Sequence, residues 1–506
     1  MDRRDLLTPQ NIRETKGSFF TPRAWADKSK EYLAEAFGDN WQEEYYVWDC
    51  AAGTGNLLAG LTNEYNVWAS DVEQGNVETM QALIDIDEDL NLLSGHVFQF
   101  DFLNDGFDKL PESLRKIIDD AEKRKKLIVY INPPYAEVSS KGVRSKAGVN
   151  QSKTRDKYSR ALGTAGRELF AQFLMRIYFE VPECKIGEFS TLKVLSGPAF
   201  ERFRDVFLAK LELCFIMPAY TFDNVDGKFP IGFKIWDTGK KEKFERIDAD
   251  VFDADSRRIG RKTFYNNKKS QIINNWISEY KRFNENPIGF LAGINGNDFQ
   301  HNNIVYILNK REQMANPRGV EITGDNLAEM VIYFAVRHSF EHTWINHNDQ
   351  FLYPNDGWET DMEFRNDCLI FTLFHAKNAI QSRHGANRWI PFTEREVGAK
   401  EKFESSFMSD FLKGKDFSAE ARTVLDAGLG LWKYYHAASK DDKTDDGNAS
   451  FYDIRGFFQG RKENGTMNAS SEDEAYNLLI GALREKLRAL TEKIQPKVYE
   501  YGFLKE

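Results

Sequence analysis

Residues 45–56 read YYVWDCAAGTGN, a short run of strand-forming residues followed by a turn that contains two glycines. Aromatic and β-branched side chains favour a strand over residues 45–48. Gly53 and Gly55 let the backbone turn sharply, and they let a ligand approach where a side chain would collide with it. We therefore predict a strand, a ligand-binding turn and then a helix over residues 56–63.

Outward from this segment, strand-like and helix-like runs alternate along the first half of the chain. Strands are predicted at residues 66–70, 96–100, 126–131, 193–195, 212–217 and 231–236, and helices at residues 77–90, 167–179 and 199–211. Such alternation is typical of a parallel sheet that is wrapped by helices. The sequence therefore predicts a doubly wound α/β domain that ends near residue 240, at the highly charged run GKKEKFER.

The remaining residues, 241–506, follow a different pattern. Asparagine-rich turns interrupt irregular sequence, and amphipathic runs at residues 325–336 and 473–494 predict helices. The hydrophilic run SKDDKTDDGN at residues 439–448 has nothing to bury and predicts a surface loop. We expect a mostly helical second region.

The composition is that of a globular protein. Of the 506 residues, 41% are hydrophobic and 14% aromatic, enough apolar surface to offset the conformational entropy lost on folding. No apolar run approaches the roughly 18 residues that span a bilayer, and the first residues lack the apolar core of an export signal. The four cysteines are scattered without a Cys-x-x-Cys pair, which disfavours a disulfide framework and a cysteine zinc site. We expect a cytoplasmic protein that has no membrane partner.

An aspartate follows each of the first three predicted strands: Asp49, Asp71 and Asp101. The carboxyl ends of parallel strands meet at one edge of a sheet, where doubly wound folds bind their ligands. Asp71 lies about 20 residues beyond Asp49, the spacing at which an acidic residue normally binds the ribose of a nucleotide. The turn lacks the third glycine of a dinucleotide fingerprint, which disfavours NAD.

The fourth predicted strand is followed by Asn132-Pro133-Pro134-Tyr135. The two prolines fix the backbone and remove two amide donors, which leaves carbonyl acceptors that can point into the crevice. If the Asn132 side-chain oxygen and the Pro133 carbonyl accept hydrogen bonds from an aromatic amine, they favour a pyramidal nitrogen and free its lone pair for attack. Tyr135 would stack on the ring of that substrate.

These motifs resemble those of the S-adenosylmethionine-dependent DNA adenine methyltransferases, which act on the exocyclic N6 amine. The resemblance extends to residues 17–22, GSFFTP, which are similar to the family segment that closes over the methionine end of the cofactor. It covers about the first 240 residues, and the order of motifs is that of the group with a carboxyl-terminal target-recognition domain. The resemblance implies a Rossmann-like methyltransferase sheet over residues 1–240 and a mostly helical DNA target-recognition region over residues 241–506.

The resemblance also assigns residues to the cofactor and to catalysis. The cofactor residues are Phe20, Thr21, Pro22, Asp49, Ala51, Gly53, Gly55, Asn56, Asp71, Val72, Asp101 and Phe102, and the catalytic residues are Asn132, Pro133, Pro134 and Tyr135. Asp49 and the turn would hold the methionine part, Asp71 the ribose, and Val72, Asp101 and Phe102 the adenine. The product would be S-adenosylhomocysteine, and no metal is implied. Cys50 departs from the family, which commonly has proline there, but its small side chain should keep the turn.

Family members stack an aromatic side chain on the extruded base, and we expect Phe222 first and Phe229 second in this role. The net charge is −10, so contact with double-stranded DNA must come from a local basic patch. A basic run begins just after Tyr135 and would hold phosphates at the crevice mouth while the base is flipped out. Its candidate phosphate ligands are Lys141, Arg144, Lys146, Lys153, Arg155 and Lys157.

Several alternatives stay open. Methylation of the cytosine N4 amine uses the same chemistry, although family members with that specificity usually carry serine in place of Asn132. Release-factor glutamine methyltransferases share Asn-Pro-Pro-Tyr but are shorter and lack the segment at residues 17–22. A DNA-binding specificity subunit with a silent pocket is the remaining alternative. A cytosine C5 methyltransferase is disfavoured because no cysteine follows a proline.

Two further sequence features bear on a metal site and on nuclease activity. His338-Ser339-Phe340-Glu341-His342 has the spacing of an inverted zinc protease motif, but no third ligand can be identified, so we expect no metal site. We find no Pro-Asp followed by Glu-x-Lys nuclease signature. The chain is therefore predicted to be a stand-alone methyltransferase or the modification arm of a restriction-modification or phage-defence system. In the second case its partner would be a separate restriction endonuclease or a specificity subunit.

Overall fold

The computed structural model describes residues 21–135, 152–222, 227–282, 287–313, 318–438 and 446–506. The chain divides into two compact units. The first comprises Met1–Lys269 together with Thr343–Asn348, and the second comprises Ser270–His342 and Asp349–Glu506. The first unit therefore extends beyond the expected boundary at residue 240, because the charged run there lies at the end of one strand and two further strands follow it.

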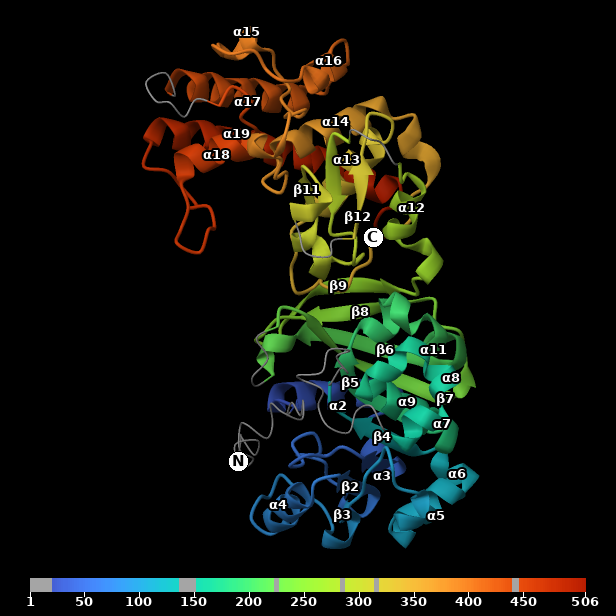
Figure 1. Cartoon of the computed structure of the whole chain (residues 1–506). Helices are drawn as coiled ribbons and strands as arrows, with labels where there is room; N and C mark the ends of the chain where they lie inside the picture. The colour runs from blue at the N-terminus through green and yellow to red at the C-terminus, as the bar shows by residue number, and fades with distance from the viewer. Residues whose placement is uncertain (1–20, 136–151, 223–226, 283–286, 314–317, 439–445) are drawn as a thin grey trace. The chain divides into compact units, whose positions relative to one another are not determined.

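The first unit is built on a twisted sheet of nine strands within the described residues (Figure 1). From one edge to the other these strands are β3 (Val97–Gln99), β2 (Val67–Asp71), β1 (Tyr46–Asp49), β4 (Leu127–Ile131), β5 (Lys185–Thr191), β7 (Pro230–Lys241), β6 (Ala209–Pro218), β8 (Arg246–Phe252) and β9 (Arg258–Tyr265). Each pair of neighbouring strands in the order β3-β2-β1-β4-β5 is parallel. β7 is antiparallel to both β5 and β6, and β9 is antiparallel to β8. The predicted doubly wound α/β fold is confirmed.

The strand order reverses between β1 and β4. From β1 the chain moves outward to β2 and β3, and then returns to place β4 on the other side of β1. In doubly wound sheets such a reversal opens a crevice beyond the carboxyl ends of the two strands, and ligands bind there. The glycine turn follows β1 and Asn132 follows β4, so both predicted motifs lie at this point.

Both faces of the sheet are covered. Side chains alternate along a strand, so Ile128 and Tyr130 of β4 join one apolar cluster while Val129 and Ile131 join the other. The first cluster contains side chains of α2 (Arg23–Phe37) and α4 (Gln74–Ile84). The second contains side chains of α5 (Glu112–Asp119), α9 (Leu169–Glu180) and α11 (Glu201–Val206). This double burial explains why β4 reads as an unbroken apolar run.

Three local predictions in this unit were wrong. Residues 56–63 form turns rather than a helix, and residues 193–195 belong to a helix, α10 (Lys193–Ser196), rather than a strand. The helix predicted at residues 199–211 ends at Val206, and β6 begins at Ala209. Strands β5, β8 and β9 were not predicted, and the interior of β5 contains Glu188. Its side chain pairs with Lys234 of β7 at 3.3 Å, and both side chains are fully buried. Lys234 Nζ also donates to the carbonyl of Gly232 at 2.9 Å.

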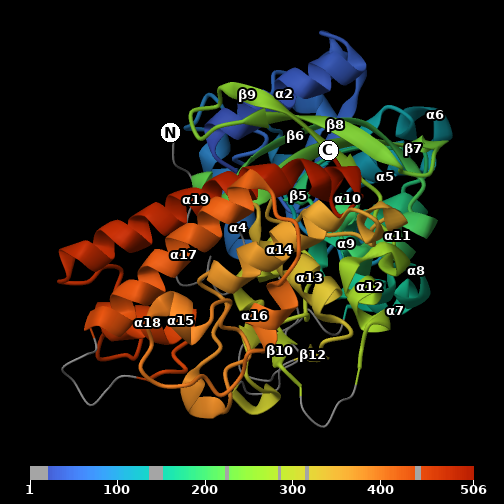
Figure 2. The ribbon, with the colours of Figure 1, turned by 90° about the horizontal axis from the view of Figure 1, so that it is seen from above.

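Helices predominate in the second unit. The main ones are α13 (Leu327–His338), α14 (Met362–Phe374), α17 (Ala419–Ala438) and α19 (Glu474–Glu500), and a small antiparallel sheet joins β10 (Gly289–Ala292) to β11 (Tyr306–Leu308) and β12 (Gly319–Ile322). The long helices α17 and α19 lie side by side (Figures 1 and 2). Of the loop predicted at residues 439–448, residues 439–445 lie outside the described residues, and residues 447–448 form a turn.

Two histidines stack in the core of the second unit. The rings of His338 and His375 have centroids 4.6 Å apart, and the ring of Phe371 stacks on His375. Burial lowers the pKa of both imidazoles, that of His375 to about 3. His338 is the first residue of the His-x-x-Glu-His motif, and its Nε2 lies 3.1 Å from the carbonyl oxygen of Val305. Among the described residues, no group of three or more His, Cys, Asp or Glu side chains is arranged to hold a metal ion. No helix within the described ranges is long and apolar enough to cross a membrane.

Candidate active site

The turn after β1 has the backbone conformation that its glycines permit. Gly53 and Gly55 have φ of 58° and 84°, in the left-handed region that disfavours side chains. A Cβ at Gly55 would also lie 3.0 Å from Leu90 Cδ1. The amide of Gly53 donates to Asp71 Oδ2 at 2.9 Å, which ties the turn to the end of β2. Glycine is therefore needed here because both positions have positive φ and because Leu90 packs closely on Gly55.

Two aspartates flank this turn at the ends of β1 and β2. Asp49 is buried, its Oδ1 accepts from the amide of Ala51 at 3.0 Å, and burial raises its pKa to about 8. Asp71 Oδ1 accepts from the amide of Glu73 and from Asn76 Nδ2, both at 2.9 Å. Burial raises the pKa of Asp71 as well. Both carboxylates are thus held in place at the same edge of the sheet.

Asp101 and its neighbour Phe102 are engaged in a local turn and in the apolar core. Asp101 closes its own turn, because its Oδ1 accepts from the amides of Leu103 and Asn104 at 3.0 and 3.2 Å. Phe102 is buried, and its ring stacks on Phe173 with centroids 5.0 Å apart. Val72 is 50% exposed beside Asp71. Of the two apolar residues expected at an adenine ring, Val72 is therefore the more accessible.

Asn132 connects two motifs that lie far apart in the sequence. Its Nδ2 donates to Thr21 Oγ1 at 2.9 Å, and its Oδ1 accepts from the hydroxyl of Tyr135. Pro133 is buried. Tyr135 packs against the apolar cluster that contains Tyr130. The structure thus brings Thr21, Asn132 and Tyr135 together at the carboxyl end of β4.

Helix α2 begins directly after Thr21 and Pro22, and it is fastened to the sheet along its length. Trp25 Nε1 donates to Thr221 Oγ1 at 2.8 Å, and Tyr32 donates its hydroxyl proton to Asp250 Oδ2 at 2.6 Å. Between them, the buried Ser29 hydroxyl hydrogen-bonds to the hydroxyl of Tyr130. These bonds fix the position of the segment that precedes the helix.

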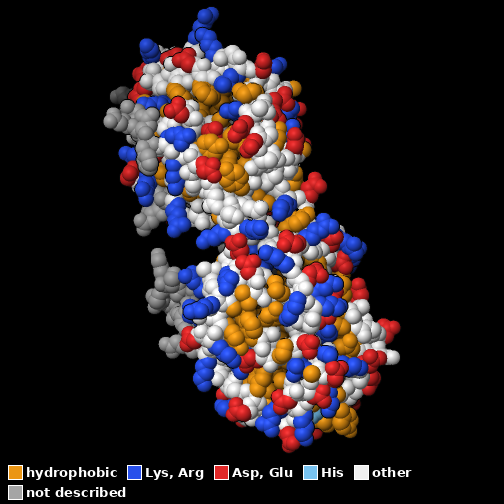
Figure 3. All heavy atoms as spheres, turned by 90° about the vertical axis from the view of Figure 1, so that its right-hand side faces the viewer, with side chains coloured by type: hydrophobic (Ala, Val, Ile, Leu, Met, Phe, Trp, Pro, Cys, Tyr) orange, Lys and Arg blue, Asp and Glu red, His pale blue; other side chains and the backbone are white. Residues whose placement is uncertain are grey.

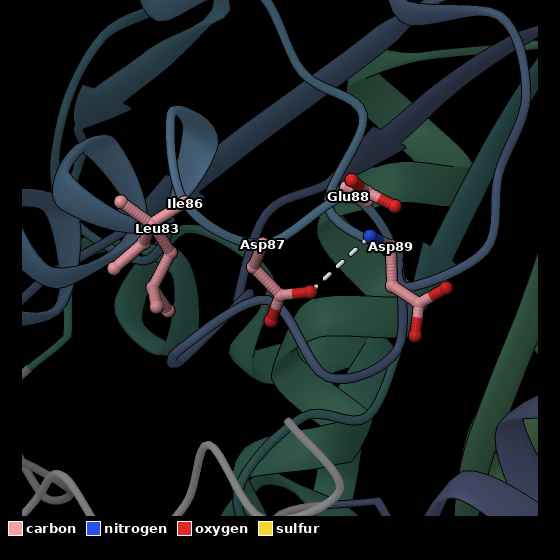
Figure 4. Close-up of a pocket in the computed structure, with 5 residues that line it drawn as sticks. All are labelled: Leu83, Ile86, Asp87, Glu88 and Asp89. Atoms are coloured by element: carbon pink, nitrogen blue, oxygen red, sulfur yellow. Dashed lines mark hydrogen bonds between the residues drawn. The ribbon is translucent and has the colours of Figure 1, made fainter.

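A cavity of about 320 Å³ lies beside the segment that follows α4 (Figure 4). It is lined by Leu83, Ile86, Asp87, Glu88 and Asp89. Its acidic side chains are engaged in local structure: Asp87 Oδ1 accepts from the amide of Asp89 at 3.2 Å, and Asp89 pairs with Arg23 of α2 at 3.0 Å. The carbonyl of Asp89 accepts from the amide of Gly60 at 2.7 Å. Through Asp89, this segment therefore connects Arg23 of α2 to Gly60, which lies five residues beyond Gly55.

The residues at the crevice fit a nucleotide-like cofactor. Thr54, between the two glycines, has a buried hydroxyl with no hydrogen-bond partner among the described residues. A buried polar atom without a partner is costly, and a bound ligand or water would satisfy it. Gly53 and Gly55 have no Cβ and leave room beside the backbone. Asp71 places a carboxylate nearby. Of the remaining expected cofactor residues, Ala51, Asn56 and Pro22 lie in the described part of the site, whereas Phe20 lies outside the described residues.

The two aromatic candidates for the extruded base differ in burial. Phe222 is only 1% exposed and packs near Phe189, with ring centroids 6.3 Å apart. Phe229 is partly exposed at the start of β7, and its ring lies 6.0 Å from that of His347. His347 belongs to Thr343–Asn348, the segment that returns to the first unit and packs Trp344 and Ile345 against its core. The structure thus makes Phe229 the more accessible ring.

The basic run is described only in its second half, since Lys141, Arg144 and Lys146 lie outside the described residues. Lys153 begins α7 (Lys153–Lys157), and its amide donates to Asn104 Oδ1 at 2.9 Å, so this helix adjoins the turn after β3. Lys153 is exposed, Arg155 is partly exposed, and Lys157 pairs with Glu180 at 2.8 Å. On the face shown in Figure 3, lysine and arginine side chains are interspersed with acidic ones.

Two residues that position the site were missed from the sequence: Asn104 and Thr221. Thr54 lies within the predicted turn, although no separate role was predicted for its hydroxyl. Thr221 and Asn104 act across 196 and 49 residues, respectively, and no local pattern reveals such contacts.

Comparisons with known proteins found no matching family model and no matching curated protein. Solved structures with some similarity include a complex of DrdV with DNA, with 13% identity and a TM-score of 0.36 over 48% of this chain and 29% of that one. A type I restriction-modification methyltransferase subunit from Streptococcus thermophilus has 17% identity and a TM-score of 0.34 over 52% of this chain and 53% of that one. The type IIG restriction endonuclease BpuSI has 18% identity and a TM-score of 0.33, over 51% and 30%. The matched region is thus about half of this chain and between 29% and 53% of these neighbours.

Proposed function

We propose that the protein is an S-adenosylmethionine-dependent DNA methyltransferase that transfers a methyl group to the N6 amine of an adenine flipped out of duplex DNA. One observation carries the proposal: the Asn132 amide lies at the carboxyl end of β4, across the strand reversal from the glycine turn that follows β1. A cofactor on the turn and an amine at Asn132 would then meet in one crevice.

The cofactor would be held by the first three strand ends. The amides of the glycine turn and the Thr54 hydroxyl would face its methionine part, and Asp71 its ribose. The exposed side chain of Val72 would cover the adenine ring. When bound, S-adenosylmethionine supplies a methyl group on a positively charged sulfur. No metal is part of this proposal.

Asn132 and Pro133 would prepare the target amine. Asn132 Oδ1 and the Pro133 carbonyl are acceptors, and an exocyclic amine that donates to both is drawn toward a pyramidal geometry. Tyr135 currently donates its hydroxyl proton to Asn132 Oδ1, so the entering amine would replace this bond. The freed Tyr135 ring would then stack on the base, with Phe229 as the accessible aromatic side chain on the β7 side.

DNA would be held by the basic run that begins beyond Tyr135. A flipped base requires a distorted backbone, and phosphate contacts stabilise it. Lys153 is exposed at the start of α7, beside the turn after β3. We propose double-stranded DNA as the substrate and a cytoplasmic, DNA-associated protein. The second unit would recognise the target sequence, and a separate restriction endonuclease or specificity subunit would complete a restriction-modification system.

The test is incubation of the full chain with S-adenosylmethionine and mixed-sequence duplex DNA, followed by nucleoside digestion and mass spectrometry. Asn132→Ala is the matched control, since it removes the amide while the glycine turn is unchanged. We expect N6-methyladenine with the natural chain, none with the variant, and equal cofactor affinity for both.

Other outcomes would redirect the assignment. N4-methylcytosine would identify the cytosine enzyme, and methylation of a protein glutamine would identify the release-factor alternative. Cofactor binding without transfer to any substrate would favour a silent specificity subunit. Loss of cofactor affinity in Asn132→Ala would contradict the role given to Asn132.

A further inference from the structure

Thr21, in the segment before α2, contacts the Asn132 amide. Thr21 is 3% exposed, and its hydroxyl accepts a hydrogen bond from Asn132 Nδ2 at 2.9 Å. The two residues are 111 positions apart, so the contact depends on how α2 docks on the sheet. It directly joins the segment expected at the cofactor to the amide expected at the substrate.

The docking of α2 makes this contact a fixed one. Side chains alternate along β4, so Asn132 follows Tyr130 on the same face of the strand. Tyr130 hydrogen-bonds to Ser29 of α2, and Trp25 of α2 donates to Thr221 at 2.8 Å. The helix therefore packs on the face of β4 that carries Tyr130, and Thr21, two residues before the helix, lies beside the Asn132 amide.

The contact matters because an amide has two different ends. Oδ1 is an acceptor and Nδ2 carries two donors, so only one orientation presents an acceptor to an incoming amine. In the structure Nδ2 points to Thr21, and Oδ1 points to Tyr135. When the amine displaces the Tyr135 hydroxyl, the bond to Thr21 can persist and hold the plane of the amide.

We propose that Thr21 is a positioning residue that orients the Asn132 amide for methyl transfer, in addition to any contact it makes with the cofactor. This inference rests on the proposed function, because it assigns Thr21 to the transfer step of the same site. It separates two roles for Thr21. A residue that only binds cofactor changes the cofactor affinity, whereas a positioning residue changes the transfer rate at saturating cofactor.

The experiment compares Thr21→Val with Thr21→Ser in single-turnover methyl transfer, with enzyme in excess over duplex DNA and cofactor at saturation. Valine keeps the shape of threonine but cannot accept a hydrogen bond, whereas serine can. Loss of a neutral hydrogen bond corresponds to a rate change of about two- to tenfold, and a displaced catalytic group costs more. We expect Thr21→Val to transfer about tenfold more slowly and Thr21→Ser to remain within about twofold of the natural chain.

Cofactor affinity is measured in parallel by titration calorimetry with S-adenosylmethionine, so that the rate at saturating cofactor is separated from any change in affinity. Thr238→Val is the matched control, because Thr238 of β7 is also buried in the first unit and its hydroxyl donates to the carbonyl of Cys184 at 2.8 Å, away from Asn132. It should keep the natural transfer rate even if it lowers the stability of the first unit.

The outcomes distinguish failure of this inference from failure of the proposed function. An unchanged rate in Thr21→Val, or a loss confined to cofactor affinity, would overturn the inference while an active natural chain upholds the proposed function. An equal slowing in Thr238→Val would assign the effect to a general loss of stability and would also overturn it. A natural chain that methylates no substrate would refute the proposed function, and the inference with it.

Discussion

Lys153 provides a quantitative test of the proposed DNA contact. It is exposed at the first position of α7, next to the turn after β3, and it forms no ion pair with another described residue. Lys157, one helical turn further on, pairs with Glu180 at 2.8 Å, and the hydrogen bond to Glu180 raises its pKa. If the run binds phosphates, Lys153 should therefore contribute a full contact and Lys157 much less.

The expected magnitude follows from counterion release. Each phosphate contact on duplex DNA contributes about 0.9 to the slope of log affinity against log salt concentration. Lys153→Ala should lower the steepness of this slope by about 0.9. Between 50 and 200 mM salt, a fourfold change, the affinity deficit of the variant should therefore shrink by about 3.5-fold.

The assay is fluorescence anisotropy with a labelled duplex at four or more salt concentrations, for the natural chain, Lys153→Ala and Lys157→Ala. Lys157→Ala should leave the slope nearly unchanged, since a lysine that stays paired with Glu180 neutralises no phosphate and releases no counterion from the DNA. An unaltered slope in Lys153→Ala would refute the reasoning and return α7 to the role of a solvated surface helix. Equal effects of both variants would show that the ion pair with Glu180 does not persist on DNA.

Three further predictions concern residues at the edge of the site and in the two cores. Phe222→Ala should lower the free energy of unfolding of the first unit in urea by about 3–5 kcal/mol, because it empties a buried site, whereas Phe229→Ala should mainly slow methyl transfer; the opposite ranking would restore Phe222 as the base contact. Because the pKa of His375 is about 3 when folded against an ordinary 6.5, the unfolded chain takes up this proton first as the pH falls. The contribution of His375 to stability is thus fully present above about pH 6.5, and in urea unfolding the loss of stability between pH 7 and pH 5 should be smaller by about 2 kcal/mol in His375→Phe than in the natural chain. Lys234→Met should cost about 3–5 kcal/mol by leaving Glu188 buried without its cation, and adding Glu188→Gln should recover part of it; no recovery would show that the pair is not coupled.

The framework of the first unit was accessible from the sequence because its strands are local apolar runs. The predicted strand at residues 126–131 corresponds to Leu127–Ile131, and that at residues 66–70 to Val67–Asp71. β5 was missed because Glu188 interrupts its apolar pattern, and only the partner Lys234 on another strand makes that burial tolerable. A pairing between two strands cannot be predicted from the local sequence of either strand.

The site was predictable in its motifs but not in its contacts. The glycine turn and Asn132 were identified because each depends on residues that are adjacent in sequence. The bond between Thr21 and Asn132 depends on the docking of α2, and Phe102, in the turn after β3, stacks on Phe173 of α9. Aromatic residues serve cores and binding sites equally well, so their type alone could not separate Phe222 from Phe229.

The return of Thr343–Asn348 to the first unit bears on how the protein is made. Trp344 and Ile345 pack against the core of that unit, although the second unit begins at Ser270. On the ribosome, the apolar surface that receives these two side chains stays uncovered while the chain from Ser270 to His342 is being synthesised. The α/β unit therefore cannot finish folding before part of its successor has emerged, and a fragment that stops at Lys269 would carry that uncovered surface permanently.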